Sequence, residues 1–270
     1  MTTLRLDVEY EGTRYRGWQE QKNARTVAGE LRRALEEALG SPVELGGAGR
    51  TDAGVHALGQ VAHARTRGRA RAAGLDERLA AALPSDIHVL SARAVDERFH
   101  ARHAALSRSY LYQVSRRRTA LAKRFVWWVR RPLDVAAMAA GADRLVGRHD
   151  FAAFCDKPDA QSSTMVVVER AEIAAVGELV LFRIEASHFL WKMVRRVVGA
   201  LVELGTGALG RDDFDALLAD GGRAARESAA AWTAPPSGLF LERVRYPGEP
   251  PLGPLRAAVP VERGLAARSD

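Results

Sequence analysis

The sequence predicts an α+β fold made of two groups of strands and helices. Residues that alternate in polarity indicate strands, as where Leu4, Leu6 and Val8 alternate with charged neighbours. Apolar residues at helical spacing indicate helices in the same parts of the chain. The two kinds of element are mixed rather than strictly alternating, and they form two groups of similar size. We therefore expect two sheet-plus-helix halves with a junction near residues 100–108.

The first half begins with a strand from Leu4 to Tyr10 that has one buried face. A loop rich in arginine and aromatic residues follows. Thr26 is then expected to cap a helix with an apolar stripe, and Gly40 to end it. The other elements predicted here are strands at 43–45, 60–64 and 87–95 and a short helix at 75–83.

The second half repeats this mixture. The predicted elements are strands at 110–114, 165–173, 179–186 and 238–246 and helices at 135–146, 188–204 and 211–218. Asp134 is the expected cap of the first of these helices, and Gly147 its end. Residues 248–270 contain proline, glycine and charge without periodicity, which predicts a flexible tail.

The chain has 270 residues, a net charge of +7 and a pI of about 10.0. Four of its 40 basic residues are lysines, so 36 are arginines. Arginine binds phosphate through a planar fork, which favours a polyanionic partner, although a GC-rich genome also gives arginine in place of lysine. The single cysteine excludes an intramolecular disulfide and argues against a cysteine-based zinc site. No apolar run approaches the roughly 18 residues of a membrane helix, and no signal peptide is recognisable. We expect a cytoplasmic protein.

The stretch "GGAGRTDAGVHALGQVAH", residues 46–63, begins like a phosphate-binding loop. It lacks the Gly-Lys-Ser/Thr of a Walker loop, and Asp52 occupies the sixth position of the dinucleotide fingerprint, where Gly or Ala is required. In one interpretation, the Asp52 side chain bonds nearby backbone amides in a turn. In the other, Asp52 beside Arg50 directs a carboxylate at a bound ligand, as a nucleophile or a base.

Arg195 and Arg196 lie in the apolar stretch "WKMVRRVVG". A buried arginine requires an acidic partner, and Asp52 is one candidate for Arg195. Adjacent helical residues point in different directions, so Arg196 can reach solvent, and exposure of both arginines is an equal alternative.

Tyr110 lies in the strand stretch "SRSYLYQV". It is either a core aromatic or, among several arginines, a platform on which a base stacks. His100 and His103 are three residues apart, but no further ligand completes a metal site at a convincing spacing. The signatures of zinc deaminases and of serine nucleophile elbows are absent.

The stretch "GRTDAGVHALGQVAH" resembles the signature of the TruA family of tRNA pseudouridine synthases. The resemblance extends to "VEYEGTRYRGWQEQ", "RFHARHAALSRSYLY", "FLWKMVRRVVGAL" and "TAPPSGLFLERVRYP", and so covers about residues 4–247. Departures are Ala28-Gly29, where the family often has a Gln-Glu-like pair, and the unusually basic "RRTALAKRFVWWV".

The resemblance implies isomerisation of uridine to pseudouridine at positions 38, 39 and 40 of the tRNA anticodon stem and loop. It implies that Asp52 is the catalytic nucleophile and that Arg195 pairs with it. Tyr110 would stack on the target uracil, and Arg50 would help to hold the RNA. No metal or organic cofactor is implied.

The resemblance also implies two ferredoxin-like halves, at 1–104 and 105–247, joined through one mixed, mainly antiparallel sheet with a central basic cleft. The tail, 248–270, lies outside it. The expected assembly is a homodimer in which one tRNA contacts both subunits, with no membrane and no metal partner. Two alternatives remain: a non-catalytic RNA-binding protein, which would tolerate asparagine at position 52, and a nucleotide-dependent enzyme that uses the glycine loop.

Overall fold

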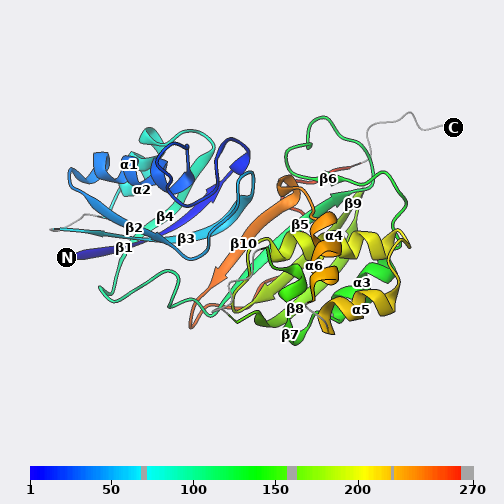
Figure 1. Cartoon of the computed structure of the whole chain (residues 1–270). Helices are drawn as coiled ribbons and strands as arrows, with labels where there is room; N and C mark the ends of the chain where they lie inside the picture. The colour runs from blue at the N-terminus through cyan, green and yellow to red at the C-terminus, as the bar shows by residue number, and fades with distance from the viewer. Residues whose placement is uncertain (68–71, 157–162, 220–221, 263–270) are drawn as a thin grey trace. The chain divides into compact units, whose positions relative to one another are not determined.

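The structure is a computed structural model that describes residues 1–67, 72–156, 163–219 and 222–262. The predicted α+β class is confirmed, with mixed, mainly antiparallel strands. The chain divides into two compact units (Figure 1). Unit 1 contains Met1–Ser109 and Phe240–Pro251, and unit 2 contains Tyr110–Leu239 and the described residues after Pro251. The chain therefore leaves unit 1 between Ser109 and Tyr110 and returns to it at Phe240.

Unit 1 is built on five strands. They are β1 (Thr2–Tyr10), β2 (Val43–Gly47), β3 (His56–Thr66), β4 (Ile87–Val95) and β10 (Leu239–Arg245). Their order is β4-β1-β3-β10, and β2 also pairs with β3. β1 is antiparallel to β3 and β4, whereas β10 is parallel to β3. β1 pairs along one edge of β3. The other edge is shared by β10, which pairs with the start of β3, and β2, which pairs with its end. The strands predicted for the first half are confirmed, with β3 starting four residues earlier than expected. β10 was predicted for the second half, but all of it except Leu239 belongs to unit 1.

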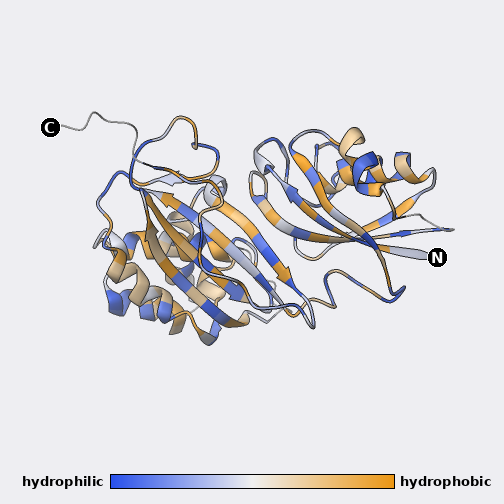
Figure 2. Ribbon diagram, turned by 180° about the vertical axis from the view of Figure 1, so that it is seen from behind, coloured by the Kyte–Doolittle hydropathy of each residue, from blue (hydrophilic) through white to orange (hydrophobic). Residues whose placement is uncertain are grey.

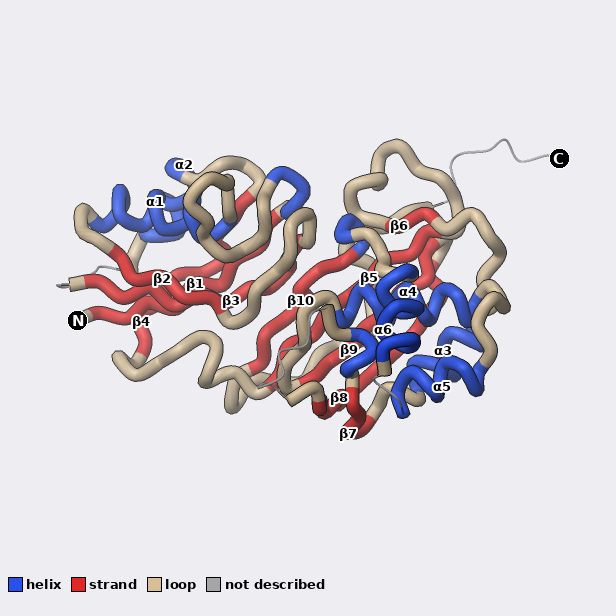
Figure 3. Tube along the Cα trace, viewed as in Figure 1, coloured by secondary structure: helices blue, strands red, loops and turns tan. Residues whose placement is uncertain are grey.

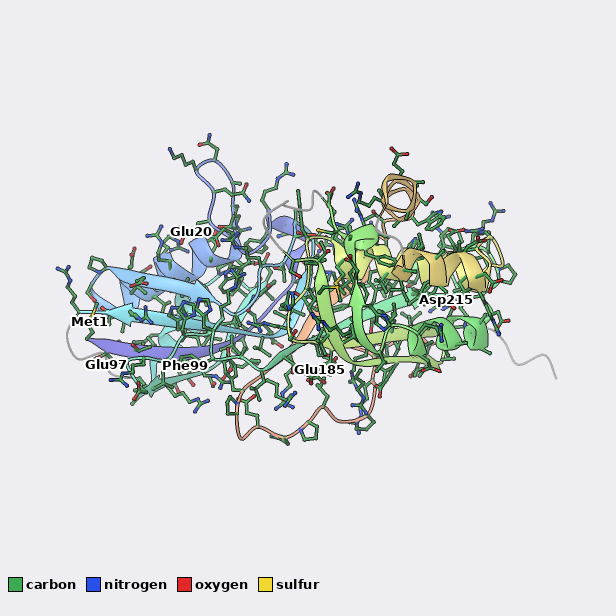
Figure 4. The ribbon with its side chains drawn as sticks, turned by 60° about the horizontal axis from the view of Figure 1, so that its bottom comes forward. Met1, Glu20, Glu97, Phe99, Glu185 and Asp215 are labelled. Atoms are coloured by element: carbon green, nitrogen blue, oxygen red, sulfur yellow. The ribbon has the colours of Figure 1, made fainter. Side chains whose placement is uncertain are left out.

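Helices α1 (Val27–Leu39) and α2 (Leu75–Ala82) cover one face of these strands (Figures 1 and 3). α1 starts and ends as predicted: Thr26 Oγ1 accepts a hydrogen bond from the Gly29 N–H, and Gly40 adopts φ 65°. Leu4 and Leu6 of β1 are fully buried. Figure 2 shows the alternation of apolar and polar residues along the strands that creates this buried face. Figure 4 shows Met1 and Glu97, whose charged groups lie 3.6 Å apart in unit 1.

Unit 2 has strands covered on one face by helices (Figure 3). The strands are β5 (Ser107–Ser115, whose first three residues belong to unit 1), β6 (Trp127–Trp128), β7 (Gly147–Asp150), β8 (Met165–Val176) and β9 (Leu179–Ala186). The helices are α3 (Val135–Asp143), α4 (Met193–Gly205), α5 (Arg211–Ala219) and α6 (Arg223–Ala231). Three short 3₁₀ helices, η1 (Gly12–Arg14), η2 (Ala152–Phe154) and η3 (Pro236–Gly238), complete the two units.

Four features of unit 2 differ from the prediction. Asp134 caps α3 as expected, but the helix ends at Asp143 rather than at Gly147, which has φ 112° and begins β7. The apolar helix expected over 188–204 begins at Met193, because Lys192 has φ 60° and cannot continue a right-handed helix. α6 was not predicted, because its sequence, "RAARESAAA", has alanine as its only apolar residue type. β6 and β7 were also missed, since two and four residues are too short for a period to be recognised.

The longest helices of the described part, α1 and α4, have 13 residues each. A membrane span requires about 20 residues. No helix among the described residues therefore meets the requirements for crossing a membrane.

Residues 252–262 are bound to unit 2. The fully buried Gln113 accepts hydrogen bonds at Oε1 from the Ala258 N–H (2.7 Å) and the Val259 N–H (3.2 Å). Gln113 Nε2 donates to Phe125 O at 2.9 Å. Buried Arg183 donates to Gly253 O at 2.8 Å. The expectation of a flexible tail is therefore wrong for this segment. Side chains of β5 and β9 bind its backbone groups, which are the same for every sequence, so the segment's own residues give no sign of this binding. Residues 263–270 lie outside the described residues.

A first prediction concerns the close approach of α4 to the chain that follows α6. A Cβ atom at Gly199 would lie 1.7 Å from Trp232 O. Alanine in place of glycine gains about 1 kcal/mol of helix propensity. Overpacking against backbone costs about 3 kcal/mol or more and dominates. We expect Gly199→Ala to lower the free energy of unfolding, measured by urea denaturation.

Gly253→Ala is the control, since nothing lies within 4 Å of its Cβ position. Equal stability of the two variants would contradict the prediction.

A second prediction concerns Gln113. Gln113→Leu keeps the approximate volume but leaves the Ala258 and Val259 N–H groups without this acceptor. An unsatisfied buried polar group costs about 1–3 kcal/mol, so we expect a loss of about 3 kcal/mol in unfolding free energy. Limited proteolysis should then cleave within 252–262. Gln21→Leu is the control, because Gln21 makes its bond to Arg16 O on the surface. Wild-type stability and protease resistance of Gln113→Leu would refute this account.

Candidate active site

The loop Ala48–Val55 connects β2 to β3 and carries Arg50 and Asp52. Its start is held by β3: the Ala48 N–H donates to Val61 O at 2.8 Å. The buried Gln60 amide binds both backbone groups of Gly49, donating to its oxygen at 2.8 Å and accepting from its N–H at 3.3 Å. These bonds fix the backbone immediately before Arg50.

The middle of the loop is held by the last residue of β1 and by residues that follow this strand. The Trp18 N–H donates to Thr51 O at 3.1 Å, and the Tyr10 and Thr51 hydroxyls lie 2.7 Å apart. Burial raises the pKa of Tyr10 to about 12, so this hydroxyl stays protonated at neutral pH. Gly17 has φ +92°, and a Cβ there would lie 2.5 Å from Thr51 O. Only glycine allows this close approach of two backbones.

Asp52 lies at the exposed side of this framework. Its own carbonyl closes a turn by accepting from the Val55 N–H at 3.1 Å, and Gly54 adopts φ +79°. Thr51 is buried, Asp52 is half-buried and Arg50 is exposed. The loop therefore presents a carboxylate-bearing residue at the surface of unit 1 on a backbone fixed directly before it.

Tyr110 and Arg195 belong to unit 2. Tyr110 lies on β5, is 8% exposed, and contacts Phe189 edge-on with ring centroids 4.9 Å apart. Arg195 lies on the first turn of α4, is half-buried, and donates from Nε to Ala234 O at 2.7 Å. The neighbouring Tyr112 hydroxyl donates to Pro235 O at 2.7 Å. Arg195 and Tyr112 thus bind adjacent residues of the same loop.

Arg196 is 5% exposed, and the alternative in which it reaches solvent is wrong. Its guanidinium donates to Cys155 O at 2.6 Å and to Asp156 Oδ1 at 3.1 Å. Asp156 supplies the acid that a buried arginine requires. Sequence reasoning missed this pairing because the two residues are 40 positions apart and share no pattern.

The structure places Arg50 and Asp52 on one loop of unit 1, and Tyr110 and Arg195 in unit 2. The expected pairing of Asp52 with Arg195 joins residues of different units and stays a prediction.

Unit 1 contains a row of three histidines, of which sequence reasoning singled out His100 and His103 but missed His63. The ring centroid of His63 lies 4.4 Å from that of His100, which lies 4.3 Å from that of His103. His63 Nδ1 accepts from the Ala101 N–H at 3.2 Å, as a neutral imidazole does. Burial, with a further contribution from His100, lowers the pKa of His63 to about 4. In the described ranges, no group of three or more His, Cys, Asp or Glu side chains could hold a metal ion.

Comparison with known proteins gives a consistent result. The family model described as tRNA pseudouridine synthase matches residues 8–103 and 142–247. This chain belongs to that family.

Individual relatives agree. "tRNA pseudouridine synthase A" of Thermoanaerobacter sp. (strain X514) is 38% identical over 248 residues, covering 91% of this chain and 100% of the relative. The protein of the same name from Rhodopseudomonas palustris (strain BisB18) is 42% identical over 249 residues, with the same coverage. A solved structure, "Crystal Structure of a Cbf5-Nop10-Gar1 Complex", aligns with 75% of this chain and 53% of its own at 13% identity. Its TM-score of 0.30 is too low to support an argument.

The pseudouridine synthase match includes the Asp52 loop with its supports Tyr10, Trp18 and Gln60. It also includes Arg195 and the whole of α4, whereas Tyr110 lies between the two matched ranges. The Asp52 loop and helix α4 thus both lie within the part of the chain that matches the family model.

The histidine row generates a third prediction, on pH. The ordinary pKa of histidine is about 6.5, and that of folded His63 is about 4, so the unfolded chain binds a proton that the folded chain does not. His63 therefore contributes its full stability above pH 6.5 and loses it as the pH falls towards 4. We expect wild type to lose about 3 kcal/mol more than His63→Gln between pH 7 and pH 4.

The measurement is urea denaturation across that pH range. His88→Gln, at an exposed position on β4, is the control and should follow wild type. Parallel pH profiles for wild type and His63→Gln would rule out this role of His63.

Proposed function

We propose that this protein isomerises uridine to pseudouridine at positions 38, 39 and 40 of the tRNA anticodon stem and loop, with Asp52 as the catalytic nucleophile. The observation that carries the proposal is the Asp52 loop. It lies within the residues that match the family model, and it presents a carboxylate on a backbone held by Gln60 and Trp18. Rigid support of this kind is what a reacting group requires.

The reaction fits a carboxylate that works without a consumed reagent. The N1–C1′ glycosidic bond breaks, the uracil rotates, and C5 forms a new bond to C1′. The hydrogen on C5 leaves as a proton, and N1 takes up a proton. Nothing is oxidised or reduced. The Asp52 carboxylate can add to C6 of the base, trap C1′ of the sugar, or assist removal of a ribose proton.

The substrate must expose its target base, and extrusion of a base costs a few kcal/mol. We assign the stacking surface for the flipped uracil to Tyr110 and a contact with the RNA to Arg50. Arg195 pairs with Asp52 and compensates the charge of that carboxylate. The bond from Arg195 Nε to Ala234 O supports this assignment, because it fixes the guanidinium on the first turn of α4.

The proposal includes the fold and assembly implied by the family resemblance. In unit 1 the elements run β1-α1-β2-β3-α2-β4, with strand neighbours β4-β1-β3 and β2 beside β3, which supports a ferredoxin-like half. We extend this arrangement to a second half, one shared sheet and a central basic cleft, with domains at 1–104 and 105–247. The active form is a cytoplasmic homodimer in which one tRNA contacts both subunits.

The fourth prediction tests the reaction with tRNA transcripts that carry tritium at C5 of uridine. Wild type should release tritium to water, because C5 loses its hydrogen when it bonds to C1′. Asp52→Asn and Asp52→Ala should reduce the rate by more than about 10³-fold, as loss of a catalytic nucleophile does. Their affinity for tRNA, measured by filter binding, should change by less than about threefold.

Asp96→Asn is the matched control: Asp96 is exposed, and its carboxylate accepts from the Arg98 N–H, a bond that asparagine can also accept. Full activity of Asp52→Asn would overturn the assigned role of Asp52. Binding of tRNA without release by wild type would instead indicate an RNA-binding protein without catalysis.

A further inference from the structure

The start of α4 is held by an ionic cluster of Asp156, Lys192 and Arg196, to which the proposed reaction assigns no role. Lys192 Nζ lies 2.5 Å from Asp156 Oδ2, and Arg196 donates to Asp156 Oδ1 at 3.1 Å. The Asp156 side chain is 19% exposed and that of Arg196 6%. One carboxylate therefore binds two cations that are four residues apart on the chain.

Lys192 adopts a backbone conformation that disfavours its side chain. Its φ is 60° and its ψ 5°, and it is the one residue other than glycine with positive φ in the part of the chain that the structure describes. Glycine would adopt this conformation without strain. A strained residue persists only where its surroundings over-determine it, and such residues concentrate at functional sites.

Residues 155 and 156 provide that over-determination. Besides the two ion pairs of its carboxylate, the Asp156 N–H donates to Trp191 O at 3.0 Å. Arg196 also donates to Cys155 O at 2.6 Å. The Lys192 ammonium lies 5.0 Å from the centroid of the Trp191 ring. The segment 191–196 is thus tied to residues 155–156 by two backbone carbonyls and two ion pairs.

The tied segment carries Arg195 and closely follows the residue that supports Tyr110. Phe189, two positions before Trp191, contacts the Tyr110 ring. Arg195, beside Arg196, is held on its other side by Ala234, which accepts from Arg195 Nε and donates its N–H to Arg195 O at 3.0 Å. A shift of the turn at Lys192 would therefore move the support of Tyr110 and the guanidinium of Arg195 together.

We infer that Asp156 and Lys192 are positioning residues, which set the first turn of α4 so that Tyr110 and Arg195 have the geometry that the reaction requires. This inference rests on the proposed function. Stability alone does not account for the cluster. A buried ion pair is weak evidence of net stabilisation, and glycine would suit position 192 better than lysine.

The test uses Lys192→Gly as its main variant. Glycine relieves the strain at φ 60°, and Asp156 keeps its pair with Arg196, so this variant should fold with a melting temperature at or above that of wild type. Single-turnover tritium release should nevertheless slow by about 10-fold to about 100-fold, because the tie to Asp156 is lost. The dissociation constant for tRNA should stay within about threefold of wild type.

Three further variants make the result specific. Lys192→Arg keeps a cation for Asp156 and should restore at least about a third of the wild-type rate. Asp156→Asn should slow release as Lys192→Gly does, with a lower melting temperature because Arg196 loses its acid. Asp215→Asn is the control. Asp215 lies on α5 (Figure 4), and the change removes only its exposed ion pair with Arg144, so the wild-type rate should be kept.

The outcomes separate the two proposals. A wild-type rate in Lys192→Gly overturns the inference and leaves the proposed function intact. Rates that follow melting temperature across the set also overturn it, because they indicate a role in stability alone. Absence of release by wild type overturns the proposed function, and the inference with it. The inference is supported if Lys192→Gly releases tritium slowly at undiminished melting temperature and Lys192→Arg keeps at least about a third of the wild-type rate.

Discussion

The Asp52 loop depends on two backbones that approach each other more closely than side chains allow. Gly17 lies against Thr51 O, and a Cβ at Gly12 would lie 1.9 Å from Val55 O. Both glycines belong to the segment after β1, and both contacts fall on the loop between β2 and β3. Because the segment can lie this close, Trp18 and Tyr10 reach Thr51, and the residue next to Asp52 is buried. Removal of either approach would loosen the loop where it presents its carboxylate.

The edge of β3 imposes a second constraint on this loop. β2 pairs with β3 from Ala62 to Thr66, and β10 takes the same edge at His56 and Ala57. The loop must therefore leave the strand after Gly47 and cannot continue the ladder. Gln60 lies between the two paired stretches, and its amide satisfies the backbone of Gly49 where regular pairing has ended. A buried glutamine here replaces the hydrogen bonds that a strand would otherwise supply.

In unit 2, charged side chains fix the start of α4. α4 is almost entirely apolar and buried, yet its first turn carries two arginines. One of them is neutralised by Asp156, and the other binds the loop at Ala234. Tyr112 of β5 binds the same loop at Pro235. Its neighbour Gln113 points to the other face of the strand, since successive residues alternate, and binds residues 258–259 there. β5 thus lies between α4 and the C-terminal segment, and Tyr110 projects from a strand held on both sides.

The sequence by itself determined the α+β class, most of the strands, the cap and end of α1, and the family to which the chain belongs. These features depend on local period, on capping side chains, or on a contiguous motif such as residues 49–63, so neighbouring residues carry the information. Only the tertiary structure decided where α4 begins, which arginine is buried, and that residues 252–262 are bound. Each of these depends on a partner distant in the chain: Asp156 for Lys192 and Arg196, and Gln113 for Ala258. Such partners share no period with the residues they bind, so no pattern along the chain reports them.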